Sequence, residues 1–512
     1  MHLHRSPVVP RDGESLAAMC FALLLAMVMS ISRVAAADSP YRFERVLTVA
    51  GPCCTDMGVD LVVDDNDCVL VTGRRGGLDF VRDGKVDIET HGTPDTLVFM
   101  SHDGNESGWI VGPGGPKEDL GKAIASDRQG GAFVVGSFMD RLDLGETVVS
   151  GRGKRDGFLT RYDQDGNPIW TVVIGGAEND ELSGVTSDAA GNAYVAGRIL
   201  GPVRIIADES MTVDAPAKAS LLIASFDPEG RLRWNRVVGG DAEGFNPKLH
   251  AGPDNAIYVG GGYFRGALDL DLDGEPDVPV AVTDPAAKDF ASIDMNGFYA
   301  RLDVDGRVQW VRSISGPRSQ VIGALTTMLD GDLVVSGGYV GDVDFDSDGK
   351  ADLEWKALGA DNNLRHSQDL NAFLLRVSPA GEHRWARRYT AGGHVAARHD
   401  GLVIGGRYTG ELDLDDDGTP ERESDEDDWS EGFVAVLDAD GAVEQVFTVV
   451  GGDGDAVSAV GATADGRKLY ATGFTRLGAD FDGDGKIESA SKCHQLGDLY
   501  LAVYELESPE PE

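Results

Sequence analysis

The sequence predicts an all-β protein, a seven-bladed β-propeller with four antiparallel strands per blade. The first observation is a short apolar segment ending in glycine that recurs along the chain, bounded by turn residues and without helical periodicity. The second is that the two ends of the repeat array complement each other. The recurring segment reads CVLVTG (68–73), AFVVG (132–136), AYVAG (193–197), IYVGG (257–261), LVVSG (333–337), LVIGG (402–406) and LYATG (469–473).

Each copy has the same companions, which supply the other strands of a blade. A strand and an Asp/Gly turn precede it, as in GVTSDAAGN, and a third strand follows it, as in GFLTRYD (157–163). A glycine turn then leads into a fourth strand that often opens with tryptophan. We interpret these tryptophans as residues that pack one blade against the next; they are Trp170, Trp234, Trp310 and Trp385.

The ends of the array predict a closed ring. The last unit stops after its third strand, LYLAVYE (499–505), whereas the array begins with an unpaired fourth strand, YRFERVLTVAG (41–51). Placing the N-terminal strand in the last blade completes that blade. Closure also removes the exposed strand edge that an open array would leave.

One repeat resembles a known family. WTVVIGGAENDELSGVTSDAAGNAYVAG (170–197) carries Trp, Gly-Gly, Asp, Val, Asp, Gly-Asn and Tyr-Val-x-Gly in order. This pattern resembles the β-propeller repeat of secreted bacterial proteins called SBBP repeats. The resemblance extends over most of 41–505 and implies a secreted or surface-associated propeller, but no single activity.

The first residues indicate an export signal. A weakly basic leader is followed by an apolar run from Leu16 to Ile31 and then by Ala35-Ala36-Ala37, a small-residue cleavage site. We therefore expect a signal peptide at 1–37, the propeller at 38–505 and a short acidic tail at 506–512. An uncleaved anchor is the alternative. The expected location is outside the cytoplasm: secreted, periplasmic or at the cell surface, with no membrane span after cleavage.

Charge restricts the partners. The chain has 86 Asp and Glu against 45 Lys and Arg, a formal net charge of −41. Such a surface repels phosphate backbones, which excludes nucleic acid as a partner and disfavours an anionic membrane surface. We expect a monomer whose ligand is a protein or a carbohydrate.

Four cysteines follow the leader: Cys53, Cys54, Cys68 and Cys493. An even number in an exported chain permits two disulfides. Because Cys53 and Cys54 come just after the closing strand, we expect both bonds near the seam between blades seven and one. Free buried thiols are the alternative.

An acidic loop, D-x-D-x-D-G-x-x-[DE], recurs between the second and third strands of blades four to seven, and is missing from blades two and three. The acids stand at positions 1, 3, 5 and 9 of the loop, and a glycine stands at position 6. They are Asp269, Asp271, Asp273 and Asp277; Asp344, Asp346, Asp348 and Asp352; Asp413, Asp415, Asp417 and Glu421; Asp480, Asp482, Asp484 and Glu488.

This pattern predicts calcium, about four ions in all. Calcium takes six to eight oxygen ligands in a flexible geometry, and the glycine lets the loop turn around an ion. No acid stands at position 12, where an EF-hand has its glutamate. The loops instead resemble the nine-residue calcium loops of integrin-type propellers. Merely solvated acidic turns are the alternative.

Long insertions follow these loops and contain Trp355 and Trp429, which could stack on a sugar or a peptide or pack against their own loops.

No GxSxG, HExxH or P-loop motif occurs, so no catalytic residues are assigned. The favoured hypothesis is a calcium-stabilised binding or scaffold protein. An enzyme with a site in the central channel is the alternative, and a quinone-cofactor dehydrogenase is a remote one.

Overall fold

The computed structural model describes 41–49, 56–76, 94–104, 108–206, 210–214, 219–239, 243–244, 246–264, 267–278, 295–314, 316, 318–346, 349–354, 356, 371–424, 430–452, 454–476, 478–489 and 497–507. The chain divides into a large compact unit, Phe43–Leu506, and a second unit formed by Met1–Arg42 and Glu507–Glu512. Within the described ranges, all regular structure is strand, and no helix is long and apolar enough to cross a membrane.

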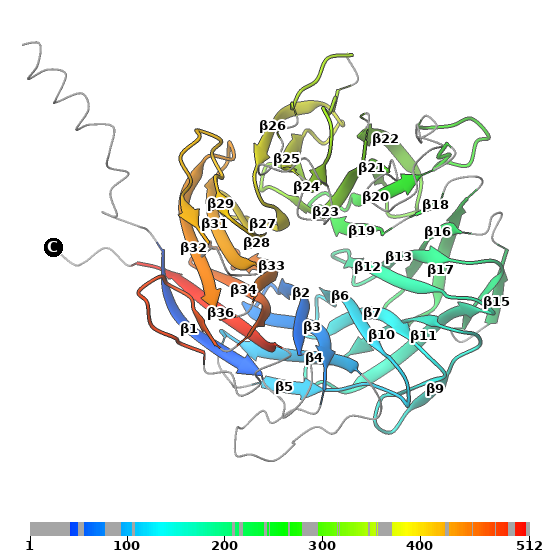
Figure 1. Cartoon of the computed structure of the whole chain (residues 1–512). Helices are drawn as coiled ribbons and strands as arrows, with labels where there is room; N and C mark the ends of the chain where they lie inside the picture. The colour runs from blue at the N-terminus through cyan, green and yellow to red at the C-terminus, as the bar shows by residue number, and fades with distance from the viewer. Residues whose placement is uncertain are drawn as a thin grey trace, which may run out of the picture. The chain divides into compact units, whose positions relative to one another are not determined.

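The large unit is a seven-bladed β-propeller, as predicted (Figure 1). Each blade is an antiparallel sheet with four main strands. In blades one to four, from inner to outer strand, these are β2 (Met57–Val63), β3 (Cys68–Arg75), β4 (Asp95–His102) and β5 (Gly108–Val111); β6 (Leu120–Ser126), β7 (Ala132–Phe138), β10 (Asp156–Tyr162) and β11 (Pro168–Gly176); β12 (Glu181–Ser187), β13 (Ala193–Ile199), β16 (Ser220–Phe226) and β17 (Leu232–Val238); β19 (Lys248–Ala251), β20 (Ile257–Phe264), β21 (Asn296–Leu302) and β22 (Val308–Ile314).

The remaining blades follow the same order. Blades five to seven contain β23 (Gln320–Thr327), β24 (Leu333–Tyr339), β25 (Asn371–Val377) and β26 (His383–Tyr389); β27 (Gly393–Arg398), β28 (Gly401–Tyr408), β31 (Glu431–Asp438) and β32 (Val443–Gly451); β33 (Ala456–Ala462), β34 (Lys468–Thr475), β36 (Asp498–Leu506) and β1 (Tyr41–Val49). Short strands in the connections are β8 (Arg141–Asp143), β9 (Val148–Ser150), β14 (Val203–Ile206), β15 (Ser210–Val213), β18 (Glu243–Gly244), β29 (Glu411–Leu412), β30 (Arg422–Glu423) and β35 (Ala479–Asp480).

Ring closure occurs as the sequence predicts. The N-terminal strand β1 pairs with β36 and is the outer strand of blade seven. The innermost strands contact one another in the order β2, β6, β12, β19, β23, β27, β33 and back to β2. They therefore surround the axis of the propeller (Figure 1).

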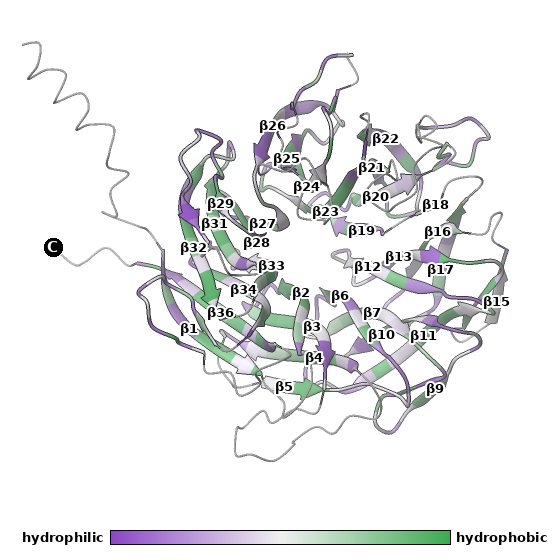
Figure 2. Ribbon diagram, in the orientation of Figure 1, coloured by the Kyte–Doolittle hydropathy of each residue, from purple (hydrophilic) through white to green (hydrophobic). Residues whose placement is uncertain are grey.

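The hydrophobic core lies between the blades, because each sheet is apolar on both faces. Hydrophobic positions lie mostly along the strands (Figure 2). In β3, Val69 and Val71 pack in a cluster with Leu499 and Leu501 of blade seven, whereas the alternating residue Leu70 packs with blade two. Because both faces need a neighbour, no blade can be stable alone.

The repeat tryptophans join neighbouring blades, as expected. The indole Nε1 of Trp234 in β17 donates to the carbonyl of Val304, 2.9 Å away in blade four. Its ring covers Gly306, where a Cβ would lie 2.9 Å from the indole. Trp109 in β5 takes the same place against Gly166, although no such residue was identified there from the repeat pattern.

The structure corrects the expectation for Cys68, which is a free, buried thiol. It begins β3 on the same face as Leu70 and packs toward blade two, away from the seam with blade seven. Its Sγ lies 3.1 Å from Nδ1 of His102 on the paired strand β4. The other expected partners, Cys53, Cys54 and Cys493, lie outside the described residues.

A buried aspartate precedes several inner strands and holds the neighbouring backbone by hydrogen bonds. Asp180, just before β12, is fully buried and accepts backbone N–H groups from Gly176 at 2.8 Å and Leu200 at 2.7 Å. Asp119 takes the corresponding place before β6, where it accepts from Gly115 and Met139. Burial outweighs these hydrogen bonds and raises the pKa of Asp119 to about 7 and that of Asp180 to about 6.

We expect thermal stability to fall as pH rises from about 4 to about 7, measured by calorimetry. An unfolded aspartate titrates near 3.9, so in this window the folded protein holds the Asp119 proton more tightly than the unfolded chain does. Asp119→Asn should make the slope shallower. Asp65→Asn, at a side chain 74% exposed, is the control. An unchanged slope in Asp119→Asn would contradict the assignment.

Removing the closing strand should destabilise the whole ring. A chain that begins at residue 50 lacks β1, including the buried Leu47 and Val49, and leaves β36 as an open edge. Relative to a chain that begins at residue 38, we expect the Tm to fall by about 10 °C or more and association to increase. Calorimetry and size-exclusion chromatography measure both effects.

Candidate metal centres

The four acidic loops share two hydrogen bonds from backbone N–H groups to carboxylates. In each, the carboxylate at position 1 accepts a hydrogen bond from the N–H of the glycine at position 6. The four N–H to carboxylate pairs are Gly274 to Asp269 (3.0 Å), Gly349 to Asp344 (2.8 Å), Gly418 to Asp413 (3.1 Å) and Gly485 to Asp480 (2.7 Å). The φ angles of these glycines lie between 83° and 96°, in the left-handed region that glycine tolerates.

The acid at position 9 returns to the start of the loop. In each loop its carboxylate accepts the N–H of position 2. The pairs are Leu270 to Asp277 (2.6 Å), Phe345 to Asp352 (2.6 Å), Leu414 to Glu421 (2.7 Å) and Phe481 to Glu488 (2.8 Å). Position 9 is Asp in two loops and Glu in the other two. The contact therefore needs a carboxylate, whereas the length of the side chain can vary.

These hydrogen bonds bring the acids together. In blade seven, one carboxylate oxygen from each of Asp480, Asp482, Asp484 and Glu488 lies within 4.8 Å of those of the other three. The acids at positions 1, 3 and 5 gather in the same way in blade four (Asp269, Asp271, Asp273) and blade six (Asp413, Asp415, Asp417). Position 1 is half-buried and positions 3 and 5 are exposed, so the cluster opens outward.

Blade five differs in its described part. Asp346 and Asp352 gather there with His383, at the start of β26, whose imidazole stacks on Phe345. Asp348 lies outside the described residues. Sequence reasoning missed His383 because it lies 31 residues beyond Asp352 and belongs to a different part of the blade. Only the pairing of strands brings it to the loop.

Mutual repulsion acts on the position-9 acids of blades four, six and seven. Burial raises the pKa of Asp277, and the nearby Asp271 and Asp269 raise it further, against two backbone hydrogen bonds that lower it. The pKa values of Glu421 and Glu488 are raised for the same reasons. A cation among these carboxylates would remove that repulsion.

The residues between the acids explain the alternating pattern. In LDLDLDGEPD, Leu268 and Leu270 are fully buried in the cluster between blades three and four, whereas Leu272 is 51% exposed. The corresponding residues of blades five and six, such as Phe345 and Leu414, are also buried. The loops of blades four, five and six therefore insert apolar side chains between two blades and present their acids on the opposite side.

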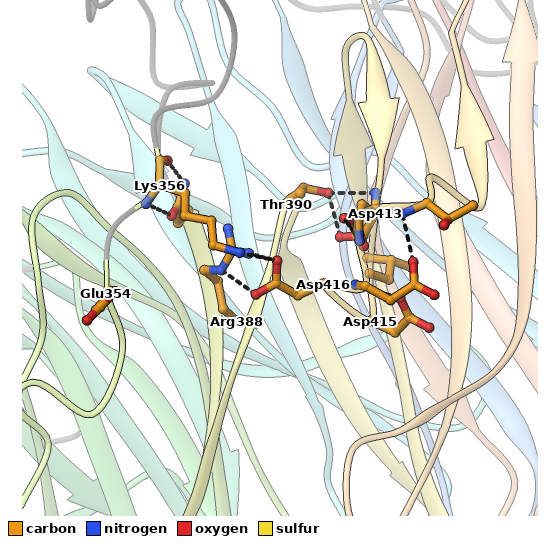
Figure 3. Close-up of polar contacts among 12 residues, drawn as sticks. Glu354, Lys356, Arg388, Thr390, Asp413, Asp415 and Asp416 are labelled. Carbon is orange, nitrogen blue, oxygen red and sulfur yellow. Dashed lines mark hydrogen bonds and ion pairs between the residues drawn. The ribbon is translucent and has the colours of Figure 1, made fainter.

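Each loop is also attached to the preceding blade. In blade six, Asp416 at position 4 pairs with Arg388 of β26 in blade five and accepts from Lys356 Nζ at 2.7 Å (Figure 3). Thr390 Oγ1 of blade five donates to the Asp413 carbonyl at 2.9 Å. In blade seven, β35 pairs with β32, the outer strand of blade six. The acid clusters thus lie at the boundaries between blades.

Blades two and three, which lack the acidic pattern, carry β-hairpins at this point. In blade three, β14 and β15 extend the sheet of blade two by pairing with β11. The connection between the second and third strands therefore joins neighbouring blades with or without the acidic pattern. In blade three it does so by adding strands to the sheet of blade two, and in the blades with acidic loops by burying part of the loop. Trp355, Trp429 and most of the long insertions lie outside the described residues.

Comparisons with known proteins assign no family to this chain. No protein-family model matches the chain, so the resemblance to SBBP repeats stays a prediction, and no curated protein matches it. Among solved structures, the chain is similar to a protein of unknown function from Dyadobacter fermentans, with a TM-score of 0.42 and 8% identity. That alignment covers 92% of this chain and 100% of the other.

Two leucines of one loop test the packing role. Leu270→Ala should lower the free energy of unfolding by about 2–5 kcal/mol, because it opens a cavity between blades three and four. Leu272→Ala, two residues away and exposed, should change it by about 0.5 kcal/mol or less. Denaturant titration measures both, and equal effects would contradict the buried/exposed alternation.

Proposed function

We propose that the protein is a secreted calcium-binding β-propeller that acts as a binding or scaffold module. The observation that carries the proposal is the repetition of the same two hydrogen bonds in four consecutive blades, which hold the position-1 and position-9 carboxylates in the same way each time. In blades four, six and seven, three or four of these carboxylates lie within 4.8 Å of one another, a grouping that a cation would stabilise.

The oxygen-only ligand sets of blades four, six and seven favour calcium. Calcium accepts many carboxylate oxygens, whereas magnesium retains several waters and uses few carboxylates. One buried oxygen, Asp413 Oδ1, has no hydrogen-bond partner among the described residues, and a bound ion would give it one. In blade five, His383 would add a nitrogen, which suits calcium less well.

Calcium would act here as a link between blades. Three loops pack apolar residues between two blades, and the blade-seven loop pairs with the outer strand of blade six, so ordering a loop also orders that boundary. Four such boundaries, from blades three and four to blades six and seven, form one continuous arc of the ring. We propose that this calcium-fixed edge presents the recognition surface for a protein or carbohydrate ligand.

Calcium binding is tested first on the mature, metal-stripped protein. We expect about four ions per chain by isothermal titration calorimetry. Calcium should also raise the Tm, and chelation by EGTA should reverse the rise, because an ion that binds only the folded state stabilises it. Failure to bind calcium, together with an unchanged melt, would overturn the proposal.

A loop variant locates the ions. Asp482→Asn combined with Asp484→Asn leaves the buried residues of blade seven intact and should reduce the stoichiometry by one ion. Asp305→Asn, an acid that lies in a turn outside the loops and is 55% exposed, is the matched control and should bind as the parent does. Loss of an ion from the control as well would contradict the assignment to the loops.

A further inference from the structure

One outer-strand position of blade five departs from the repeat. It is the position at which the fourth strand begins to pair with the third. Blades two, three, four and six have an apolar residue there: Pro168, Leu232, Val308 and Val443. The last three of these pack against the hydrophobic clusters between blades. Blade five instead has His383, although packing alone asks for an apolar residue at this place.

The imidazole of His383 is held against the acidic loop of its own blade. It stacks on Phe345, with ring centroids 6.4 Å apart and planes inclined by 16°. Phe345 stands at position 2 of the blade-five loop and is itself buried, with its ring centroid 5.1 Å from that of Phe373. The stack therefore ties the histidine to the loop.

One nitrogen of this imidazole lacks a partner. Nε2 of His383 is buried, and no hydrogen-bond partner meets it among the described residues. In a neutral imidazole one ring nitrogen donates a hydrogen bond and the other accepts one. A buried nitrogen that does neither costs free energy unless a ligand supplies the missing contact. This observation is independent of the acids, and it points to a ligand that accepts nitrogen.

Two acids of the loop lie beside the histidine. One ligand atom from each of Asp346, Asp352 and His383 lies within 4.8 Å of those of the other two. Asp352 is fixed there, because its Oδ2 accepts the N–H of Phe345 at 2.6 Å. Both carboxylates are exposed, so an ion can enter from solvent. The three groups combine nitrogen and oxygen ligands, whereas the sets of blades four, six and seven contain oxygen alone.

We propose that Asp346, Asp352 and His383 bind Zn²⁺, or another transition-metal dication that accepts imidazole, in preference to calcium. The inference rests on the proposed function in one respect, that these loops hold metal ions, and departs from it in the identity of the ion.

The donor set carries this choice of ion. Imidazole suits zinc and its neighbours in the first transition row, whereas calcium and magnesium prefer oxygen ligands. Two carboxylates balance the charge of a divalent ion. With the imidazole they make three protein ligands, and a water completes the tetrahedral coordination that zinc takes. When calcium is the only ion present, the carboxylates of blade five can still hold it, and Zn²⁺ then displaces it.

The test uses the full mature chain, stripped of metal and then saturated with calcium. Zn²⁺ is titrated by isothermal titration calorimetry while calcium stays in excess. We expect one Zn²⁺ to bind per chain and at most one Ca²⁺ to be released. Absence of Zn²⁺ binding would overturn the inference. The calcium stoichiometry is measured before Zn²⁺ is added, so it judges the proposed function separately.

A histidine variant locates the Zn²⁺ ion. His383→Val gives blade five the residue that blades four and six have at this register, which favours folding. It should weaken Zn²⁺ binding by about tenfold or more and leave the calcium stoichiometry unchanged. His399→Val, at an exposed histidine outside the loop, is the matched control and should bind Zn²⁺ as the parent does.

Two results would contradict the site: parental Zn²⁺ affinity in His383→Val, or a comparable loss in His399→Val. If His383→Val does not fold, Asp346→Asn is used, because it changes an exposed side chain. That variant should also weaken Zn²⁺ binding by about tenfold or more, and unchanged affinity would count against the site.

Discussion

The rest of the structure depends on one constraint: each blade is apolar on both faces and must be covered by a neighbour on each side. In β3, for example, Val69 faces blade seven and Leu70 faces blade two. Such a sheet cannot end the array without exposing a face, so the array closes into a ring. The strand that closes it, β1, comes from the opposite end of the chain and completes the blade begun by β33.

The acidic loops extend this constraint beyond the strands. Leu268 and Leu270 contribute to the same inter-blade cluster as Leu221 and Ile223, so the loop is part of the core on one side and acidic on the other. A segment that packs between blades on one side and gathers carboxylates on the other therefore needs alternating apolar and acidic residues. A metal bound there would act on the contact between blades rather than on a loose surface turn.

A repeated architecture makes departures from the repeat informative. Where the inner strands need only to pack side by side, alanine or glycine suffices, as at Ala123, Gly184 and Ala324. Asp60, Lys248 and His394 replace small residues at the same register. Packing does not demand them, since four blades do without. The same holds for His383 in the outer strands, where four other blades have an apolar residue, and the proposed metal site of blade five accounts for that departure.

The sequence alone determined the number of blades, the four-strand unit and the closing strand, because these follow from local apolar periodicity, turn residues and the unmatched ends of the array. It also located the acidic loops, whose acids are close in sequence. Only the tertiary structure decided that Cys68 faces blade two and is free, that His383 lies beside Asp352, and that Asp60, Lys248 and His394 stand at one register of the inner strands. Those relationships join residues that are far apart in the chain. They depend on strand pairing and on the face each side chain occupies, which a short sequence motif does not contain.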